Sequence, residues 1–264
     1  MSRAAVPPRH LSGAYRVAEG LLRPPLTFLT RRDWRGGENL PRTGGFVAAG
    51  NHVSHIDPLT FAHFLLDHGC PPRFLGKESV FRVPVVGRIV TAAGQIPVLR
   101  ESSDAGRALA AAMEGVRAGE CVAIYPEATL SRDPALWPMV GKTGAARVAL
   151  STGAPVIPIA QWGPQQLLPP YSLRLRFWRS TLVHVWAGPA VDLSAYHDRP
   201  LDGPTLRAAT ADIMAAITQL LERIRGEKAP AERWDPRAHG QPLTGNPRKR
   251  IAPGDPPAEG RTGT

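Results

Sequence analysis

The sequence predicts one α/β domain, residues 37–226, in which a mixed, largely parallel sheet is flanked by helices. Short apolar runs bounded by Gly, Pro or charged residues recur along the chain, and helical stretches separate them. Such alternation is typical of βα units, whose strands pair in parallel. The chain has 264 residues, of which 43% are hydrophobic. It is therefore long and apolar enough for one good-sized core with residues left for tails.

The strands are predicted from two kinds of pattern. Continuous apolar runs indicate strands that are buried on both faces, and these are residues 46–50, 73–76, 95–99, 121–125 and 156–160. Alternating apolar and polar residues indicate half-exposed strands near a sheet edge, and these are residues 173–177 and 181–187.

Helices are predicted between the strands and after the last one. The helical stretches are residues 58–69, 80–94, 104–119, 142–153 and 205–226. Those at 80–94, 104–119 and 142–153 each end at a glycine, which is a common helix stop. The last stretch is the longest and closes the domain.

Two segments flank this domain. Residues 1–36 contain a basic, amphipathic stretch from His10 to Arg32, which the Pro-Pro pair at 24–25 is expected to divide into two short helices. Such helices can lie in a bilayer interface or pack on the core, and periodicity alone does not choose between these arrangements. Residues 227–264 are rich in Pro, Gly and Arg and lack apolar periodicity, so a disordered basic tail is expected.

The charge balance favours an anionic partner. The formal net charge is +10 and the isoelectric point is about 10.5, which suits nucleic acid, acidic lipid head groups or phosphorylated metabolites. Frequent arginine codons in a GC-rich genome explain the charge equally well. The sequence carries no helix-turn-helix, zinc or RNA-binding signature, so no nucleic-acid partner is expected.

Compartment and membrane topology are indicated only weakly. The two cysteines, Cys70 and Cys121, match no metal or redox spacing and favour a reducing cytosol. No signal peptide is recognisable. No apolar run reaches the roughly 20 residues that a membrane-spanning helix needs, so the chain is expected to lie on a membrane rather than cross it.

Polar side chains follow several predicted strands, at the end of the sheet where ligands bind in open α/β folds. The first such stretch, residues 51–57, reads NHVSHID. Asp57 before Pro58 has the pattern of a helix cap, and Ser54 lies at capping-box spacing, so both Asp57 and Ser54 have structural roles available. His52 has no such role, because no secondary-structure propensity favours histidine directly after a buried strand.

His52 and Asp57 are predicted to form a base with its orienting carboxylate. Residues five apart on one helix face roughly 140° away from each other, so the pair meets only if His52 lies on the turn and Asp57 in the first helical turn. A carboxylate on one imidazole nitrogen leaves the other nitrogen to take a proton. No nearby Ser or Cys is placed as a covalent nucleophile, so the base is expected to act on a substrate hydroxyl. His55 is expected to be exposed at the start of the helix.

Four motifs occur in order along the middle of the chain. They are NHVSHID (51–57), GKESVFRVPVVGRIVTAAGQIPVLRES (76–102), YPEATLSRD (125–133) and GAPVIPIA (153–160). In order and spacing, residues from about 46 to 163 resemble the PlsC-type 1-acylglycerol-3-phosphate O-acyltransferases, a family of glycerolipid acyltransferases. The resemblance implies transfer of a fatty acyl group from acyl-CoA or acyl carrier protein to a hydroxyl of a lysophospholipid or of glycerol phosphate, in phospholipid biosynthesis. The thioester is already activated, so no metal and no bound cofactor is expected.

The resemblance also implies roles for individual residues. His52 and Asp57 match the catalytic His–Asp pair of the family, and Glu127 matches the glutamate of its third motif. The residues expected to bind substrate are Glu127, Thr129, Arg132, Lys77, Arg100 and Lys142. Glu127 has an alternative role as a partner of a backbone amide or an arginine, and Lys77 and Arg100 have one as solvated charges.

The third motif departs from the P-E-G-T-R-S pattern of the family. Leu130 stands where the phosphate-binding arginine is expected. A leucine cannot donate to a phosphate, whereas arginine offers a bidentate fork. Either Arg132, Lys142 or Arg100 takes over that contact, or the acceptor carries a different head group. A lipid-binding relative with weak activity is a further alternative.

The expected partners follow from the resemblance and the charge together. They are acyl-CoA or acyl carrier protein, a lysophospholipid and an anionic membrane surface. The expected location is peripheral, on the cytoplasmic face of the cell membrane, because the basic amphipathic segment at the N-terminus suits anionic lipid.

Overall fold

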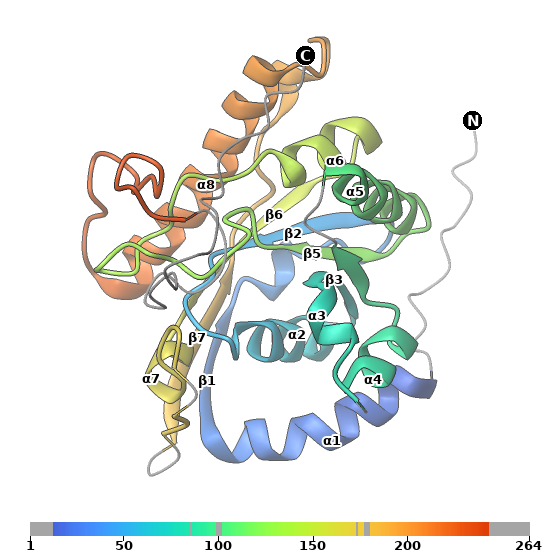
Figure 1. Ribbon diagram of the computed structural model, residues 1–264, viewed down its shortest axis with the longest axis vertical. Coiled ribbons are helices and arrows are strands. Elements are labelled where there is room, and N and C mark those ends of the chain that lie inside the picture. The colour runs from blue at the N-terminus through green and yellow to red at the C-terminus, as the bar shows by residue number, and fades with distance from the viewer. Residues whose placement is uncertain (1–12, 85, 99–101, 173, 177–179, 243–264) are drawn as a thin grey trace, which may run out of the picture.

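The computed structural model describes residues 13–84, 86–98, 102–172, 174–176 and 180–242. A seven-stranded sheet with helices on both faces forms the body of the molecule (Figure 1), which confirms the predicted α/β fold. From edge to edge, the strands are β1 (Thr30–Arg35), β7 (Thr181–Ala187), β6 (Val156–Trp162), β2 (Phe46–Gly50), β5 (Cys121–Ile124), β3 (Pro72–Lys77) and β4 (Ile96–Val98).

Strand direction divides the sheet into two parts. Every pair of neighbouring strands is parallel except β6 and β7, which are antiparallel. β1 and β7 therefore run opposite to the other five strands. As a result, the amino ends of β1 and β7 lie at the same end of the sheet as the carboxyl ends of β2, β5 and β6.

Helices cover the sheet in two groups. The helices are α1 (Gly13–Leu29), α2 (Asp57–Asp67), α3 (Glu78–Phe81), α4 (Val86–Ala92), α5 (Ser102–Arg117), α6 (Gly144–Thr152), α7 (Pro164–Leu167) and α8 (Gly203–Arg225), with 3-10 turns η1 (Gly37–Asn39) and η2 (Ser194–Tyr196). Helices α5, α6 and α8 pack on one face. Helix α2 packs on the other face, and α1, α3 and α4 lie on the same side of the sheet as α2 (Figure 1).

The central strand β2 shows why the apolar runs have no polar alternation. Val47 and Ala49 point into the core beneath α5, α6 and α8, whereas Phe46 and Ala48 point into the core beneath α2. All four side chains are fully buried. Burial of a large apolar side chain contributes about 1.5–3 kcal/mol to stability, so apolar residues are favoured at every position of a strand that is covered on both faces.

The predicted helix over residues 80–94 is two helices. Helix α3 ends at Phe81 and α4 begins at Val86, because Pro84 lies between them and proline disrupts a helix interior. Gly87 then lets α4 pack closely on the end of α3. A Cβ atom at Gly87 would lie 1.9 Å from the Phe81 carbonyl oxygen.

The predicted break in the N-terminal helix is wrong, because α1 runs through both prolines. Contacts on either side of the prolines hold the helix against the body, and after them Leu26 is buried in a cluster with Ile56 and Leu167. Tyr15 Oη donates to the Pro72 carbonyl at 3.1 Å, and Arg23 forms an ion pair with Asp67 at 2.5 Å. Tertiary packing therefore outweighs the local cost of proline. Neither α1 nor any other helix in the described part of the chain is long and apolar enough to cross a membrane.

Strand β1 was not predicted. Residues 30–35, which the sequence assigns to the N-terminal helical segment, form the sheet edge, so the sheet begins before residue 37. The run TRRDWR lacks apolar alternation, and its pairing partner is distant in sequence, with Thr30 opposite Thr181. Asp33 Oδ2 on β1 lies 2.6 Å from His184 Nδ1 on β7. This polar contact helps to hold the edge strand, together with Trp34, which packs against the core beneath α2.

Two further expectations are corrected. Residues 174–176 lie in no strand of the described sheet, and 173 and 177 are outside the described residues. The tail was expected to be disordered from residue 227, but residues 227–242 contact the body, with the Val140 N–H donating to the Trp234 carbonyl at 3.1 Å. Residues 243–264 are outside the described residues.

Candidate active site

The candidate site lies at the carboxyl ends of β2 and β5. The loop of residues 51–56 leaves β2 and leads into α2, and the loop that begins at Tyr125 leaves β5 beside it. The two loops are joined where the Ser131 N–H donates to the His52 carbonyl at 2.7 Å. Two motifs that are far apart in the sequence therefore meet at one end of the sheet, as expected for an open α/β fold.

His52 and Asp57 face each other in this loop. His52 Nδ1 lies 2.9 Å from Asp57 Oδ2. The Asp57 side chain is fully buried, whereas the His52 side chain is 16% exposed. His52 lies on the turn and Asp57 in the first turn of α2, which is the arrangement that the pair requires. His55 is exposed, as predicted.

The Asp57 carboxylate also orders the turn itself. Its Oδ2 atom accepts hydrogen bonds from the Val53 N–H at 2.5 Å and the Ser54 N–H at 2.8 Å. The predicted N-cap role is wrong, because the cap residue is Ile56 and no side chain caps the helix start. The carboxylate instead folds back over the turn that carries His52.

These donors determine the tautomer of His52. Because Oδ2 of Asp57 accepts from two backbone N–H groups, it acts as an acceptor toward His52 as well. The proton therefore lies on His52 Nδ1, and Nε2 keeps a lone pair. A neutral imidazole with a buried anion behind it can take a proton from a hydroxyl at Nε2.

The His52 ring is also fixed from one side by an aromatic neighbour. Tyr125 stacks on it with ring centroids 4.2 Å apart and an angle of 17° between the planes. Tyr125 directly follows β5, so the end of a strand positions it. Tyr125 was not predicted as a site residue, although it is an aromatic residue directly after a strand at the end of the sheet where polar residues gather.

Glu127 supports the backbone of the site. Its Oε1 accepts from the His52 N–H and its Oε2 from the Met139 N–H, both at 3.0 Å. Glu127 is only 3% exposed. Burial raises the pKa of the Glu127 carboxyl to about 8, although the two backbone donors lower it. Both carboxylate oxygens of Glu127 thus accept from backbone amides, which is its alternative role, and substrate binding by Glu127 stays a prediction.

The motif around Glu127 makes a tight turn. The Ala128 N–H donates to the Tyr125 carbonyl at 2.9 Å, and Ala128 has a φ of 56°. This left-handed region favours glycine, and a residue with a side chain loses about 1–2 kcal/mol there. The resemblance expects glycine at this position, so alanine keeps the turn with some strain.

Ser54 connects the loop to the neighbouring helices. Its Oγ donates to the Leu168 carbonyl at 2.7 Å and accepts from the Ile56 N–H at 3.2 Å. Ile56 is buried in a small apolar cluster with Leu26 of α1 and Leu167 of α7. The loop that carries His52 is thus braced by both α1 and α7.

The other predicted substrate residues differ in accessibility. Arg132 is only 6% exposed, and its Nε lies 3.4 Å from Tyr171 Oη. Thr129 is half-buried and Lys142 is exposed. Lys77 is the last residue of β3, whereas Arg100 is outside the described residues. Only part of the predicted set is therefore open to a ligand in this structure.

Leu130 lies inside the protein rather than in an open acceptor site. It is 3% exposed, and its carbonyl accepts from Tyr171 Oη at 3.1 Å. An arginine at this position would bring a charge into the core, which is costly without a partner. The apolar residue is therefore consistent with its surroundings.

Comparisons with known proteins agree with this geometry. Residues 31–162 match the model of a protein family described as Acyltransferase. The chain is 29% identical over 194 residues to the 1-acyl-sn-glycerol-3-phosphate acyltransferase of Borreliella burgdorferi, which covers 72% of this chain and 71% of that protein. It is 35% identical over 141 residues to 1-acyl-sn-glycerol-3-phosphate acyltransferase BAT2, chloroplastic, of Brassica napus, which covers 53% of this chain and 39% of that protein.

A solved structure has the same fold. The crystal structure of the 1-acyl-sn-glycerophosphate (LPA) acyltransferase PlsC from Thermotoga maritima matches with a TM-score of 0.62 and 23% sequence identity. The match covers 81% of each chain. At this identity, the likeness shows a shared fold.

Proposed function

The chain belongs to the Acyltransferase family and is an O-acyltransferase, and from that premise we propose that it acylates a hydroxyl of a lysophospholipid such as 1-acylglycerol-3-phosphate. The acyl donor is acyl-CoA or acyl carrier protein, and the reaction is a step of phospholipid biosynthesis. The observation that carries the proposal is the 2.9 Å contact between His52 Nδ1 and the buried Asp57 carboxylate. The names of the Borreliella and Brassica relatives support this class of acceptor.

His52 acts as the general base in this proposal. Its Nε2 takes the proton from the acceptor hydroxyl while the oxygen attacks the carbonyl carbon of the thioester. The C–S bond then breaks, and the proton passes from Nε2 to the leaving sulfur, so an ester and a free thiol result and the imidazole is restored. The Asp57 carboxylate stabilises the transient imidazolium. General base catalysis typically contributes about 10²–10⁴-fold in rate.

The acceptor phosphate requires a cation, and Lys142 is the best candidate. Lys142 is exposed, and its backbone N–H donates to the Pro126 carbonyl at 2.8 Å, next to Glu127. Arg132 is buried at 6% exposed. If Lys142 does not bind phosphate, the buried Leu130 favours the second candidate function, acyl transfer to an acceptor with a different head group.

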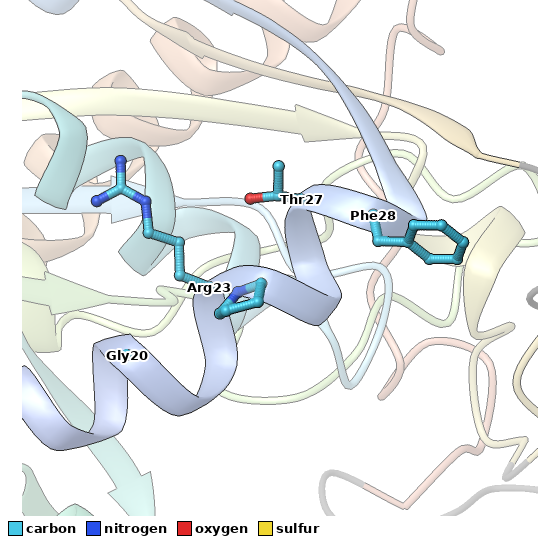
Figure 2. A pocket seen from close by; sticks show the side chains of 5 residues that line it. Gly20, Arg23, Thr27 and Phe28 are labelled. Atoms are coloured by element: carbon cyan, nitrogen blue, oxygen red, sulfur yellow. The ribbon is translucent and has the colours of Figure 1, made fainter.

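Helix α1 attaches the enzyme to a membrane in this proposal. Val17, Leu21 and Phe28 are 66%, 63% and 81% exposed, and they share one stripe of the helix with Pro24. Beside the stripe is a shallow hollow of about 620 Å³, lined by Gly20, Arg23, Pro24, Thr27 and Phe28. Figure 2 shows the Phe28 ring projecting from the C-terminal end of the helix. Exposed apolar residues with nearby arginines suit the interface of an anionic bilayer.

The location that follows is peripheral, on the cytoplasmic face of the cell membrane. Burial of Phe28 and Leu21 in lipid and attraction of arginines to acidic head groups would act together. Because exposed charges are screened by salt, vesicle co-sedimentation should weaken as the ionic strength rises. Vesicle binding that does not change with salt would contradict the proposed attraction between the arginines and the acidic head groups.

Product analysis tests the proposed reaction. The full chain is incubated with acyl-CoA and a panel of lysophospholipids, and the products are identified by mass spectrometry. We expect diacylated product from 1-acylglycerol-3-phosphate, and a loss of at least about 10²-fold in His52→Ala. His197→Ala, which removes an exposed histidine, serves as the matched control. Near wild-type activity in a folded His52→Ala protein would refute the role of His52.

A further inference from the structure

A Leu/Arg segment leaves the sheet next to the candidate site. Residues 174–176 belong to no strand of the described sheet, although their alternating pattern predicts one. Leu175 is 41% exposed, and Arg174 and Arg176 are exposed on either side of it. The Arg176 N–H donates to the Leu167 carbonyl at 2.8 Å, which holds the segment at the end of α7. Core packing does not explain an exposed leucine between two cations.

The segment lies near the exposed end of α1. Leu167, whose carbonyl accepts from the Arg176 N–H, packs with Leu26 of α1 in one apolar cluster. Phe28, at the end of α1, is 81% exposed. Figure 1 likewise shows the end of α1, α7 and the start of β7 at the same end of the molecule. Exposed apolar side chains from two distant parts of the sequence, Leu175 and Phe28, therefore lie at one end of the molecule.

Arginines flank the exposed apolar side chains of both segments. Residues 20–32 and residues 171–187 contain arginines but no aspartate or glutamate. Arg23 and Arg32 form ion pairs with Asp67, and Arg23 also pairs with Glu19, so Arg174 and Arg176 add positive charge beyond that of α1. Apolar side chains flanked by cations are complementary to an interface that is apolar inside and anionic at its surface.

We propose that Leu175, with Arg174 and Arg176, forms a second membrane contact that continues the surface of α1. This inference rests on the proposed attachment of α1 to an anionic bilayer. A single amphipathic helix leaves the protein free to tilt about the helix axis. A second contact away from that axis fixes the tilt, and it does so at the end of the sheet where His52 lies.

Fluorescent reporters on introduced cysteines test this placement in the full chain. Leu175→Cys, Phe28→Cys and Leu201→Cys are each labelled with an environment-sensitive fluorophore. The native Cys70 and Cys121 are 2% and 0% exposed, so the dye reacts with the introduced thiol. Leu201 is a matched control because it too is 41% exposed, and it follows η2 on the opposite side of the sheet from α1.

The reporters are read with phosphatidylcholine vesicles that contain or lack phosphatidylglycerol. We expect a blue shift at positions 28 and 175 with phosphatidylglycerol and no shift at position 201. A shift at 28 without one at 175 overturns the second contact and leaves the docking of α1 intact. No shift at either position refutes both proposals.

Removal of the cations gives a second test that needs no label. Arg174→Ala combined with Arg176→Ala should weaken binding to phosphatidylglycerol vesicles by roughly fivefold for each arginine, whereas Arg199→Ala, also at an exposed position, should not. Unchanged vesicle binding together with slower transfer from acyl carrier protein would instead assign the segment to an acidic protein partner. Loss of self-association without vesicles would assign it to a second copy of the chain, and either outcome overturns the proposal.

Discussion

Replacement of Asp57 by asparagine removes the charge of the His–Asp pair while keeping its shape. Asp57 Oδ2 accepts from His52 Nδ1 at 2.9 Å and from the backbone N–H groups of Val53 and Ser54 at 2.5 and 2.8 Å. An amide oxygen at the same place keeps all three hydrogen bonds, now as neutral ones. The amide nitrogen then occupies the position of Oδ1, which is buried and has no hydrogen-bond partner among the described residues.

The structure sets the size of the expected effects. A hydrogen bond to a charged group contributes about 1.5–3 kcal/mol and a neutral one about 0.5–1.5 kcal/mol. The imidazolium of His52 forms only during the reaction, so that difference of about 1–1.5 kcal/mol lowers kcat by about 5- to 13-fold. Losses in kcat of about 10⁴-fold occur where the introduced asparagine turns its NH₂ group toward the histidine and so reverses the tautomer of the imidazole. A flip is disfavoured here because it would direct the amide N–H groups at the N–H groups of Val53 and Ser54.

The assay is kcat for acyl transfer together with the melting temperature. The buried amide nitrogen should also lower stability by about 1–3 kcal/mol. Asp202→Ala, which removes the cap at the start of α8 and should cost about 0.5–2 kcal/mol, controls for a loss of stability without a loss of rate. A folded Asp57→Asn protein with kcat within about threefold of wild type would refute the role of the pair.

Other changes around the site have equally defined outcomes. Because burial raises the Glu127 pKa to about 8 from an ordinary 4.5, the native state holds more protons than the unfolded state between these values. The free energy of unfolding should therefore fall as pH rises through this window, by at most about 1.4 kcal/mol per pH unit; Glu127→Gln should remove this slope, and denaturant titrations at several pH values check it. Ser54→Ala should lower kcat by about tenfold with little change in KM, and a change confined to KM would assign Ser54 to substrate binding. Lys142→Ala should raise KM for lysophosphatidic acid by about tenfold but not for a neutral lysolipid, and equal effects on both would exclude the phosphate contact. Leu130→Arg should lower the melting temperature, because position 130 is 3% exposed, and an unchanged melting temperature would contradict this placement.

Features that depend on neighbouring residues could be predicted from the sequence. The strands at 46–50 and 121–124 are continuous apolar runs because both of their faces are covered. The geometry of the His52–Asp57 contact could be predicted because both residues lie in one turn, only five positions apart. Local pattern and local geometry were sufficient in these cases.

Features that depend on distant contacts could not be predicted. Strand β1 exists because residues 30–35 pair with 181–186, and nothing in TRRDWR indicates that partner. Glu127 supports His52 because the turn and the Met139 loop converge on its two oxygens, so its sequence motif does not distinguish a support from a ligand. Helix α1 likewise continues through its prolines because of contacts to other elements, such as that between Arg23 and Asp67.

The antiparallel pairing of β6 with β7 has a consequence for how the enzyme meets its acceptor. It brings the end of α1, the start of β7 and the loop of His52 to one end of the sheet. An enzyme docked by that end, as proposed, takes its acceptor from the plane of the membrane. The acceptor concentration that sets its rate is then the number of acceptor molecules per unit area of membrane. Dilution of the lysophospholipid with inert phospholipid should slow turnover at constant bulk concentration, whereas dilution of the loaded vesicles in buffer should not. The direction of two strands thus decides whether the search for substrate takes place in two dimensions or in three.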